Sequence, residues 1–169
     1  MTSKYSTEME KGFIVPVKLV KWMHQNLQLI DNGVQIKQTW LYEQNLPTEG
    51  RGGYRARLRS IKATGRRAAY LYEVKYDIQE VEGTRESIEI SSPITEDEFN
   101  TIANLHGVVG WVNKTRLLFG DKKWIYSVDI YEGEKMARIE IEFEDLEQAS
   151  IWICPDWLKP YVEGNNQCT

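Results

Sequence analysis

Charged residues recur at every second position along several segments of this chain, with mostly apolar or small residues between them. Side chains alternate between the two faces of a β-strand, so such a segment has one charged and one apolar face. Arginines stand at positions 55, 57 and 59, and glutamates stand at 140, 142 and 144. The pattern predicts two-faced strands whose apolar faces other elements cover.

Eight segments have the composition and spacing of strands, and short turns separate most of them. They are 8–15, 34–43, 54–61, 68–78, 84–90, 108–118, 123–131 and 135–143. An apolar stripe at helical spacing predicts a helix over 17–30, ended by Asp31-Asn32-Gly33. A capping box, Thr95 to Glu98, predicts a second helix that ends near Gly107. The run 44–53 is a loop by composition.

Many antiparallel strands in succession favour a barrel, because closure removes exposed strand edges. We therefore predict an α+β, mainly β fold: a closed antiparallel eight-stranded barrel with helices packed outside. The apolar faces then meet the helices and the charged faces line the interior. We expect a single domain over 1–169, with a core of about 8–158 and a flexible tail over 159–169.

Composition limits the partners and the compartment. The net charge of -4 argues against nucleic acid as the main partner. No stretch is long and apolar enough to span a bilayer, and no export signal is visible, so we expect a cytoplasmic protein without a membrane partner. Cys154 and Cys168 are expected to be free thiols. No glycine-rich phosphate loop is present. A monomer and a homodimer both stay open.

Each charged pair alone is explained by an exposed strand face. The whole set is harder to explain in this way, since Arg and Lys facing Glu and Asp make a costly interior unless they bind something. Arginine matches phosphate oxygens with two parallel hydrogen bonds, and clustered carboxylates are ligands for Mg²⁺ or Mn²⁺. The combination predicts a polyphosphate held with a divalent metal and phosphoryl-transfer chemistry.

Short motifs in a fixed order carry a family resemblance that runs from about Glu8 to Leu158. They are Glu8-Met9-Glu10-Lys11, Ile36-Lys37-Gln38-Thr39-Trp40-Leu41, Arg55-Ala56-Arg57, the strand ending at Lys75, Arg85 with Glu89, Lys114-Thr115-Arg116, Trp124 with Asp129, Glu140-Ile141-Glu142 and Pro155-Asp156-Trp157-Leu158. This series resembles the CYTH domain, or triphosphate tunnel metalloenzymes. That family includes thiamine triphosphatases, inorganic triphosphatases and class IV adenylyl cyclases.

The resemblance implies roles for particular residues in a triphosphate tunnel. Phosphate binding would fall to Arg55, Arg57, Lys75, Arg85, Lys114 and Arg116. Metal binding would fall to Glu8, Glu10, Glu89, Asp129, Glu140 and Glu142, with Mg²⁺ or Mn²⁺ as cofactor. The catalytic set would be Glu8, Glu10, Lys11, Glu140 and Glu142. The implied activity is metal-dependent hydrolysis of inorganic tripolyphosphate or of an organic or nucleoside triphosphate.

Two positions depart from the family pattern. Lys11 falls one position before the expected lysine, where Gly12 stands, and a β-bulge at Gly12 would turn Lys11 inward. Ser87 stands where the motif has its first glutamate, and adjacent Glu86 points away unless the register slips. These departures motivate a second hypothesis, non-hydrolytic binding or sequestration of a phosphorylated nucleotide or polyphosphate. A class IV-type adenylyl cyclase is a third.

Other residues have simpler explanations. His24 and His106 lie on the two predicted helices without a ligand or nucleophile partner at useful spacing, so we expect surface or capping roles. The tryptophans are expected to pack outside the barrel under the helices rather than to stack on bases.

Overall fold

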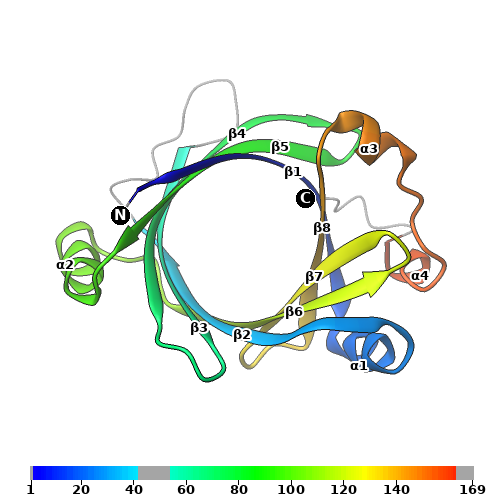
Figure 1. Cartoon of the computed structure of the whole chain (residues 1–169), viewed down its shortest axis with the longest axis horizontal. Coiled ribbons are helices and arrows are strands. Elements are labelled where there is room, and N and C mark those ends of the chain that lie inside the picture. The colour runs from blue at the N-terminus through cyan, green and yellow to red at the C-terminus, as the bar shows by residue number, and fades with distance from the viewer. Residues whose placement is uncertain (1, 42–53, 163–169) are drawn as a thin grey trace.

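Eight antiparallel strands close into one barrel (Figure 1). The computed structural model describes residues 2–41 and 54–162. The strands are β1 (Lys4–Pro16), β2 (Gln28–Trp40), β3 (Tyr54–Ala63), β4 (Ala69–Val81), β5 (Thr84–Ile94), β6 (Val112–Asp121), β7 (Trp124–Tyr131) and β8 (Met136–Phe143). Around the barrel their order is β1-β5-β4-β3-β2-β6-β7-β8. The predicted fold class, mainly β with a closed eight-stranded barrel, is confirmed.

Helices lie on the outside of this barrel (Figure 1). In the described ranges they are α1 (Val17–Asn26), α2 (Glu96–His106), α3 (Leu146–Ile151) and α4 (Lys159–Val162). The sequence predicted α1 and α2 but neither α3 nor α4. Residues 159–162, assigned to a flexible tail, form α4, and Tyr161 and Val162 pack against an apolar cluster. None of the helices in the described ranges has the length and apolar character needed to cross a membrane.

The first helix is shorter than its apolar stripe predicted. It ends at Asn26, and β2 begins at Gln28 because that residue pairs with β6 opposite Gly120. The Asp31-Asn32-Gly33 segment is an irregularity inside β2, where the register with β6 shifts between residues 29 and 34. Gly33 has a φ of +117°, and its N–H donates to Asp31 Oδ1 at 3.1 Å. Pairing with a distant strand overrides the local helical pattern here.

The second helix begins and ends where the sequence predicted. Thr95 Oγ accepts from the Glu98 N–H at 3.1 Å, and Glu98 Oε2 accepts from the Thr95 N–H at 2.9 Å, so the capping box is confirmed. Gly107 is the C-terminal cap.

The strand predicted over 108–118 begins only at Val112. The predicted loop 44–53 lies outside the described residues.

The apolar cores lie outside the barrel wall, between the strands and the helices. The larger cluster packs α1, α3 and α4 against outward residues of β1, β6, β7 and β8, including Phe13, Phe119 and Ile139. The smaller cluster joins Phe99 of α2 to Ala56 and Leu58 of β3. Since the apolar residues of each strand face outward, the alternate residues face into the barrel.

Candidate functional site

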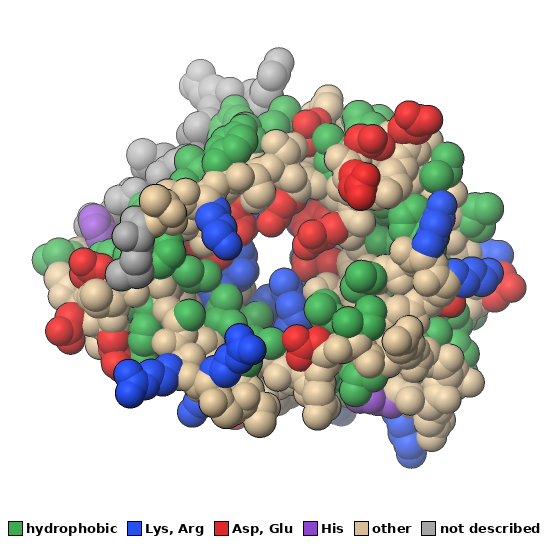
Figure 2. Space-filling model, in the orientation of Figure 1, with side chains coloured by type: hydrophobic (Ala, Val, Ile, Leu, Met, Phe, Trp, Pro, Cys, Tyr) green, Lys and Arg blue, Asp and Glu red, His purple; other side chains and the backbone are tan. Residues whose placement is uncertain are grey.

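A cavity of about 270 Å³ runs inside the barrel, and its wall is almost entirely charged. Figure 2 shows an opening through the centre of the molecule ringed by basic and acidic side chains. The sequence-predicted residues on the wall are Glu8, Glu10, Arg55, Arg57, Lys75, Arg85, Glu89, Lys114, Arg116, Glu140 and Glu142. The structure therefore brings together predicted residues from six of the eight strands.

Five further residues of the wall were not among the predicted site residues. They are Gln38, Trp40, Arg59, Tyr131 and Arg138. Arg59 shares the predicted charged face of Arg55 and Arg57, and Arg138 precedes Glu140 by two positions. Strand alternation alone would have found both of these arginines.

The interior is balanced in charge over the described residues. Its basic side chains are Arg55, Arg57, Arg59, Lys75, Arg85, Lys114, Arg116 and Arg138. Its acidic side chains are Glu8, Glu10, Glu89, Glu140 and Glu142 on the wall, with Glu73, Asp77 and Asp129 paired to wall cations. Cations and carboxylates are thus equal in number, at eight each.

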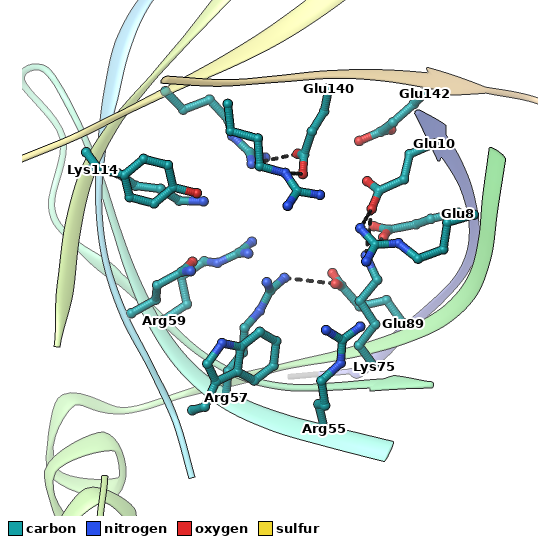
Figure 3. Close-up of a pocket in the computed structure, with 16 residues that line it drawn as sticks. Glu8, Glu10, Arg55, Arg57, Arg59, Lys75, Glu89, Lys114, Glu140 and Glu142 are labelled. Atoms are coloured by element: carbon teal, nitrogen blue, oxygen red, sulfur yellow. Dashed lines mark hydrogen bonds and ion pairs between the residues drawn. The ribbon is translucent and has the colours of Figure 1, made fainter. Parts of the chain in front are cut away.

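Arginines of β3 hold a network with carboxylates of β4 and β5. Arg57 donates through Nε to Glu73 Oε2 at 2.5 Å. A terminal nitrogen of Arg57 donates to Glu89 Oε2 at 2.9 Å (Figure 3). Arg59 lies beside them, with Nη1 3.4 Å from Glu73 Oε1. Burial, followed by the charge of Arg57, lowers the pKa of Arg59. Adjacent cations that disfavour one another's charge form a site suited to an added anion.

The glutamates of β1 are tied to cations of β4 and β5. Lys75 Nζ lies 2.8 Å from Glu8 Oε2 and 3.5 Å from Glu10 Oε1, and Arg85 also donates to Glu10 Oε1. Burial opposes the ionisation of Glu10, but the charges of Lys75 and Arg85 outweigh it and lower its pKa. Neither glutamate is free of a cation in this arrangement.

Asp129 is buried on the inward face of β7 and holds two cations of β6. Arg116 donates to its two oxygens at 2.7 and 2.8 Å, and Lys114 donates to Oδ2. Burial raises the pKa of Asp129, but the hydrogen bonds and charge of Arg116 bring it below its usual value. Burial lowers the pKa of Lys114 to about 8. Both carboxylate oxygens are therefore paired with cations, and a metal at Asp129 stays a prediction.

The carboxylates suited to a metal stand on the adjoining strands β1 and β8. Glu10 pairs directly with Glu142 in the sheet, and Glu140 follows on the same face (Figure 3). Partial burial, then the charges of Glu8 and Glu10, raise the pKa of Glu142. A divalent cation would relieve this repulsion, so the donor chemistry fits Mg²⁺ or Mn²⁺. Among the described residues no three acidic, His or Cys side chains converge closely enough to hold an ion, because Glu8, Glu10 and Glu140 turn to cations.

The predicted catalytic lysine does not reach the cavity. Lys11 Nζ donates to the Glu82 carbonyl oxygen at 3.2 Å and lies 5.7 Å from the Trp152 ring centroid. The register of β1 against β8 is unbroken through Gly12, which pairs with Glu140. No bulge turns Lys11 inward, and its predicted place in the site is wrong.

Polar atoms without a hydrogen-bond partner remain along the wall. In the described part of the chain these buried atoms include Arg55 Nε, Arg85 Nε and Ser87 Oγ. Ser87 pairs with Glu8 of β1 and faces inward, while Glu86 accepts from Gln79 on the outside. Buried donors with no acceptor are expensive in a folded protein unless a ligand or water supplies one.

The remaining candidates divide between the wall and the exterior. Trp40 lines the cavity, with its ring centroid 5.3 Å from the Arg55 guanidinium and 5.4 Å from that of Arg57, so the prediction of outer packing is wrong for this residue. Trp152 does pack outside, stacked on Phe13. His24 lies edge-on to Phe119, away from the cavity. Cys154 Sγ donates to the Pro155 carbonyl oxygen at 3.9 Å, and Cys168 lies outside the described residues.

No family model and no curated protein sequence matches the chain. Solved structures do match. A conserved hypothetical protein of Pyrococcus furiosus has 14% identity and a TM-score of 0.62, over 85% of this chain and 84% of that one. A protein of Pyrococcus horikoshii has 19% identity and a TM-score of 0.59, over 90% and 82%.

A third structure carries a described activity. It is an adenylyl cyclase-like protein of Hippeastrum for which a dominant triphosphatase activity is described, with 13% identity, a TM-score of 0.56 and coverage of 85% and 82%. At these low sequence identities the likeness shows a shared fold and nothing more. With the closed barrel and the charged interior already in place, the chain has the fold of the CYTH, or triphosphate tunnel, proteins.

Proposed function

We propose that this protein hydrolyses a triphosphate bound inside the barrel, with the help of a divalent metal. The observation that carries the proposal is the wall itself: arginines and lysines of β3 to β6 face glutamates of β1 and β8 across one cavity. Charge-assisted hydrogen bonds from guanidinium groups are strong ligands for phosphate oxygens. The triphosphatase activity described for the Hippeastrum protein of the same fold supports the proposal.

The cations would position the phosphate chain. The Nε groups of Arg55 and Arg85 already lack acceptors, so phosphate oxygens would satisfy them. Arg57 and Lys75 would exchange a carboxylate partner for phosphate. That exchange frees Glu8 and Glu10, which with Glu140 and Glu142 would hold the metal. When bound, the metal supplies charge neutralisation and a more acidic water.

A second function, binding without turnover, has its own observation. The inward position after Glu8 and Glu10 is Gly12, and Lys11 points outward, so the β1 wall offers no inward lysine beside its glutamates. The remaining cations still suit a polyphosphate. This arrangement favours capture over catalysis, and one assay separates the two.

The test is phosphate release from tripolyphosphate and from ATP with Mg²⁺ or Mn²⁺, repeated with excess EDTA. We expect release with metal and none with EDTA. Glu140→Gln should abolish release, and Glu134→Gln, an exposed turn residue, should not change it. Tight tripolyphosphate binding without release above the Glu140→Gln level would establish the binding function instead. If the protein neither binds tripolyphosphate nor releases phosphate, both proposed functions are contradicted.

The pairing of carboxylates with cations also predicts how the free protein binds metal. Lys75 holds both Glu8 and Glu10, so Mn²⁺ should bind weakly in the absence of phosphate. Lys75→Met removes this competing charge and should strengthen Mn²⁺ binding by about tenfold or more, because nearby charges interact strongly in a partly buried site. Calorimetric titration with Mn²⁺ alone measures the effect.

The matched control is Lys62→Met, an exposed lysine of β3. It should leave Mn²⁺ affinity at the wild-type value. If Lys75→Met binds Mn²⁺ no more tightly than this control, Glu8 and Glu10 are not metal ligands. Circular dichroism of each variant checks that the barrel is still folded.

A further inference from the structure

The charged tunnel adjoins a second, larger cavity whose wall is partly apolar. This cavity has a volume of about 770 Å³ and shares Arg116, Glu140 and Glu142 with the tunnel. It lies at the end of the barrel where β6 turns into β7. The two cavities therefore adjoin each other along these three residues.

The inward faces of β6 and β7 change character along their length. Next to the tunnel they carry Arg116 and Asp129, which pair across the two strands. One step further toward the mouth Leu118 pairs with Ser127, and then Gly120 pairs with Ile125. Charge thus gives way to apolar and small side chains over two further positions on each strand.

Apolar side chains at this mouth are exposed to solvent. Ile125 is 54% exposed, and Ile30 of β2 is 48% exposed. A Cβ on Gly120 would lie 3.2 Å from Ile30 Cδ1, so Ile30 lies against Gly120, the residue of β6 that pairs with Ile125. Figure 2 shows hydrophobic side chains at this edge of the opening, over β6 and β7.

An aromatic pair and a polar rim complete the wall. Trp124 and Phe143 meet edge to face, with ring centroids 5.7 Å apart. Lys123 Nζ lies 4.7 Å from the Trp124 ring centroid, and Gln148 lies on the α3 side. Apolar and aromatic surface with a few polar groups, in a volume of this size, is the usual composition of a site for an organic ligand.

We propose that this mouth binds a flat, ring-bearing organic group attached to the phosphate chain, so the substrate is an organic triphosphate rather than inorganic tripolyphosphate. The inference rests on the proposed function, because the tunnel must hold the phosphates. Phosphate oxygens gain nothing from Leu118, Ile125 or Ile30, whereas a ring would remove them from water. Trp40, which lines the tunnel but not the second cavity, is less suited to a ring because it already contacts two guanidinium groups.

The test compares three ligands that resist hydrolysis, each with Mg²⁺: imidotriphosphate, adenylyl imidodiphosphate and uridylyl imidodiphosphate. Calorimetry should show tighter binding for at least one nucleotide analogue than for imidotriphosphate. Ile125→Thr and Ile30→Thr should each weaken the binding of that analogue by about three- to tenfold, because each substitution removes apolar contact area. Both variants should leave imidotriphosphate affinity unchanged.

Ile153→Thr is the matched control, since Ile153 is 79% exposed and belongs to neither cavity. If imidotriphosphate binds as well as both nucleotide analogues, or if the Ile125 and Ile30 variants behave like this control, the inference is overturned while the proposed function stands. If none of the three ligands binds, the proposed function itself fails.

Discussion

Replacing Asp129 by alanine should lower the free energy of unfolding by about 3–5 kcal/mol, the usual cost of removing one partner of a buried ion pair. Asp129 is 2% exposed and is shared by Lys114 and Arg116, so the substitution leaves two cations without their carboxylate. Thermal unfolding should show a fall in Tm of roughly 10 °C for a protein of this size.

The matched control is Asp156→Ala. That carboxylate also pairs with a lysine, Lys159, but its side chain is 95% exposed, and we expect no measurable change in Tm. Equal Tm values for the two variants would show that Lys114 and Arg116 find other partners.

The stabilisation by Asp129 should depend on pH. The pKa of Asp129 in the folded state lies below its usual value of about 4, so Asp129 adds to the free energy of unfolding above that pH. This stabilisation is lost as the pH falls through the folded-state pKa.

Replacing Arg57 by lysine should weaken tripolyphosphate binding by about 10- to 100-fold. Lysine keeps the charge but loses the planar fork through which Arg57 reaches two groups at once, Glu73 and Glu89. Each charge-assisted hydrogen bond contributes about 1.5–3 kcal/mol, and about 1.4 kcal/mol corresponds to a tenfold change in Kd. Calorimetric titration in the presence of Mg²⁺ measures the loss.

Arg66→Lys provides the control for this substitution, because Arg66 is an exposed residue of the turn between β3 and β4. Its affinity for tripolyphosphate should equal that of the wild type. Unchanged affinity in Arg57→Lys would mean that the polyanion does not contact the β3 wall. The conservative substitution keeps a cation beside Glu73 and Glu89, so the folded state remains available for the measurement.

Strand periodicity predicted most of the charged residues that share the interior. Arg55 and Arg57 on β3 and Glu140 and Glu142 on β8 all line one cavity. Side chains alternate along a strand, so an apolar face that packs outward fixes which residues face inward. The same rule applies to Arg138, which shares the inward face of Glu140 but was not among the predicted site residues.

Register was the part that local sequence could not supply. Whether Lys11 or Gly12 faces inward depends on whether β1 contains a bulge, and β1 pairs with β8 more than a hundred residues away in the chain. The predicted boundary between the first helix and the strand after it was wrong for the same reason, because Gln28 pairs with Gly120 of β6. Partner choice among the interior charges, such as Glu8 with Lys75 and Glu10 with Arg85, also depends on distant strands.

The equality of cations and carboxylates inside the barrel has a consequence for the stoichiometry of binding. A triphosphate carries at least about four negative charges near neutral pH, since each phosphate oxygen site ionises at or below pH 6–7. An interior with eight charges of each sign cannot neutralise that excess by itself. The ligand must therefore bring its own counter-ions or take up protons. The affinity for the triphosphate should rise with the concentration of divalent metal, and more steeply than it would if one metal ion bound with each ligand. In this respect the barrel behaves as an ion exchanger, in which phosphate and metal replace existing internal pairs.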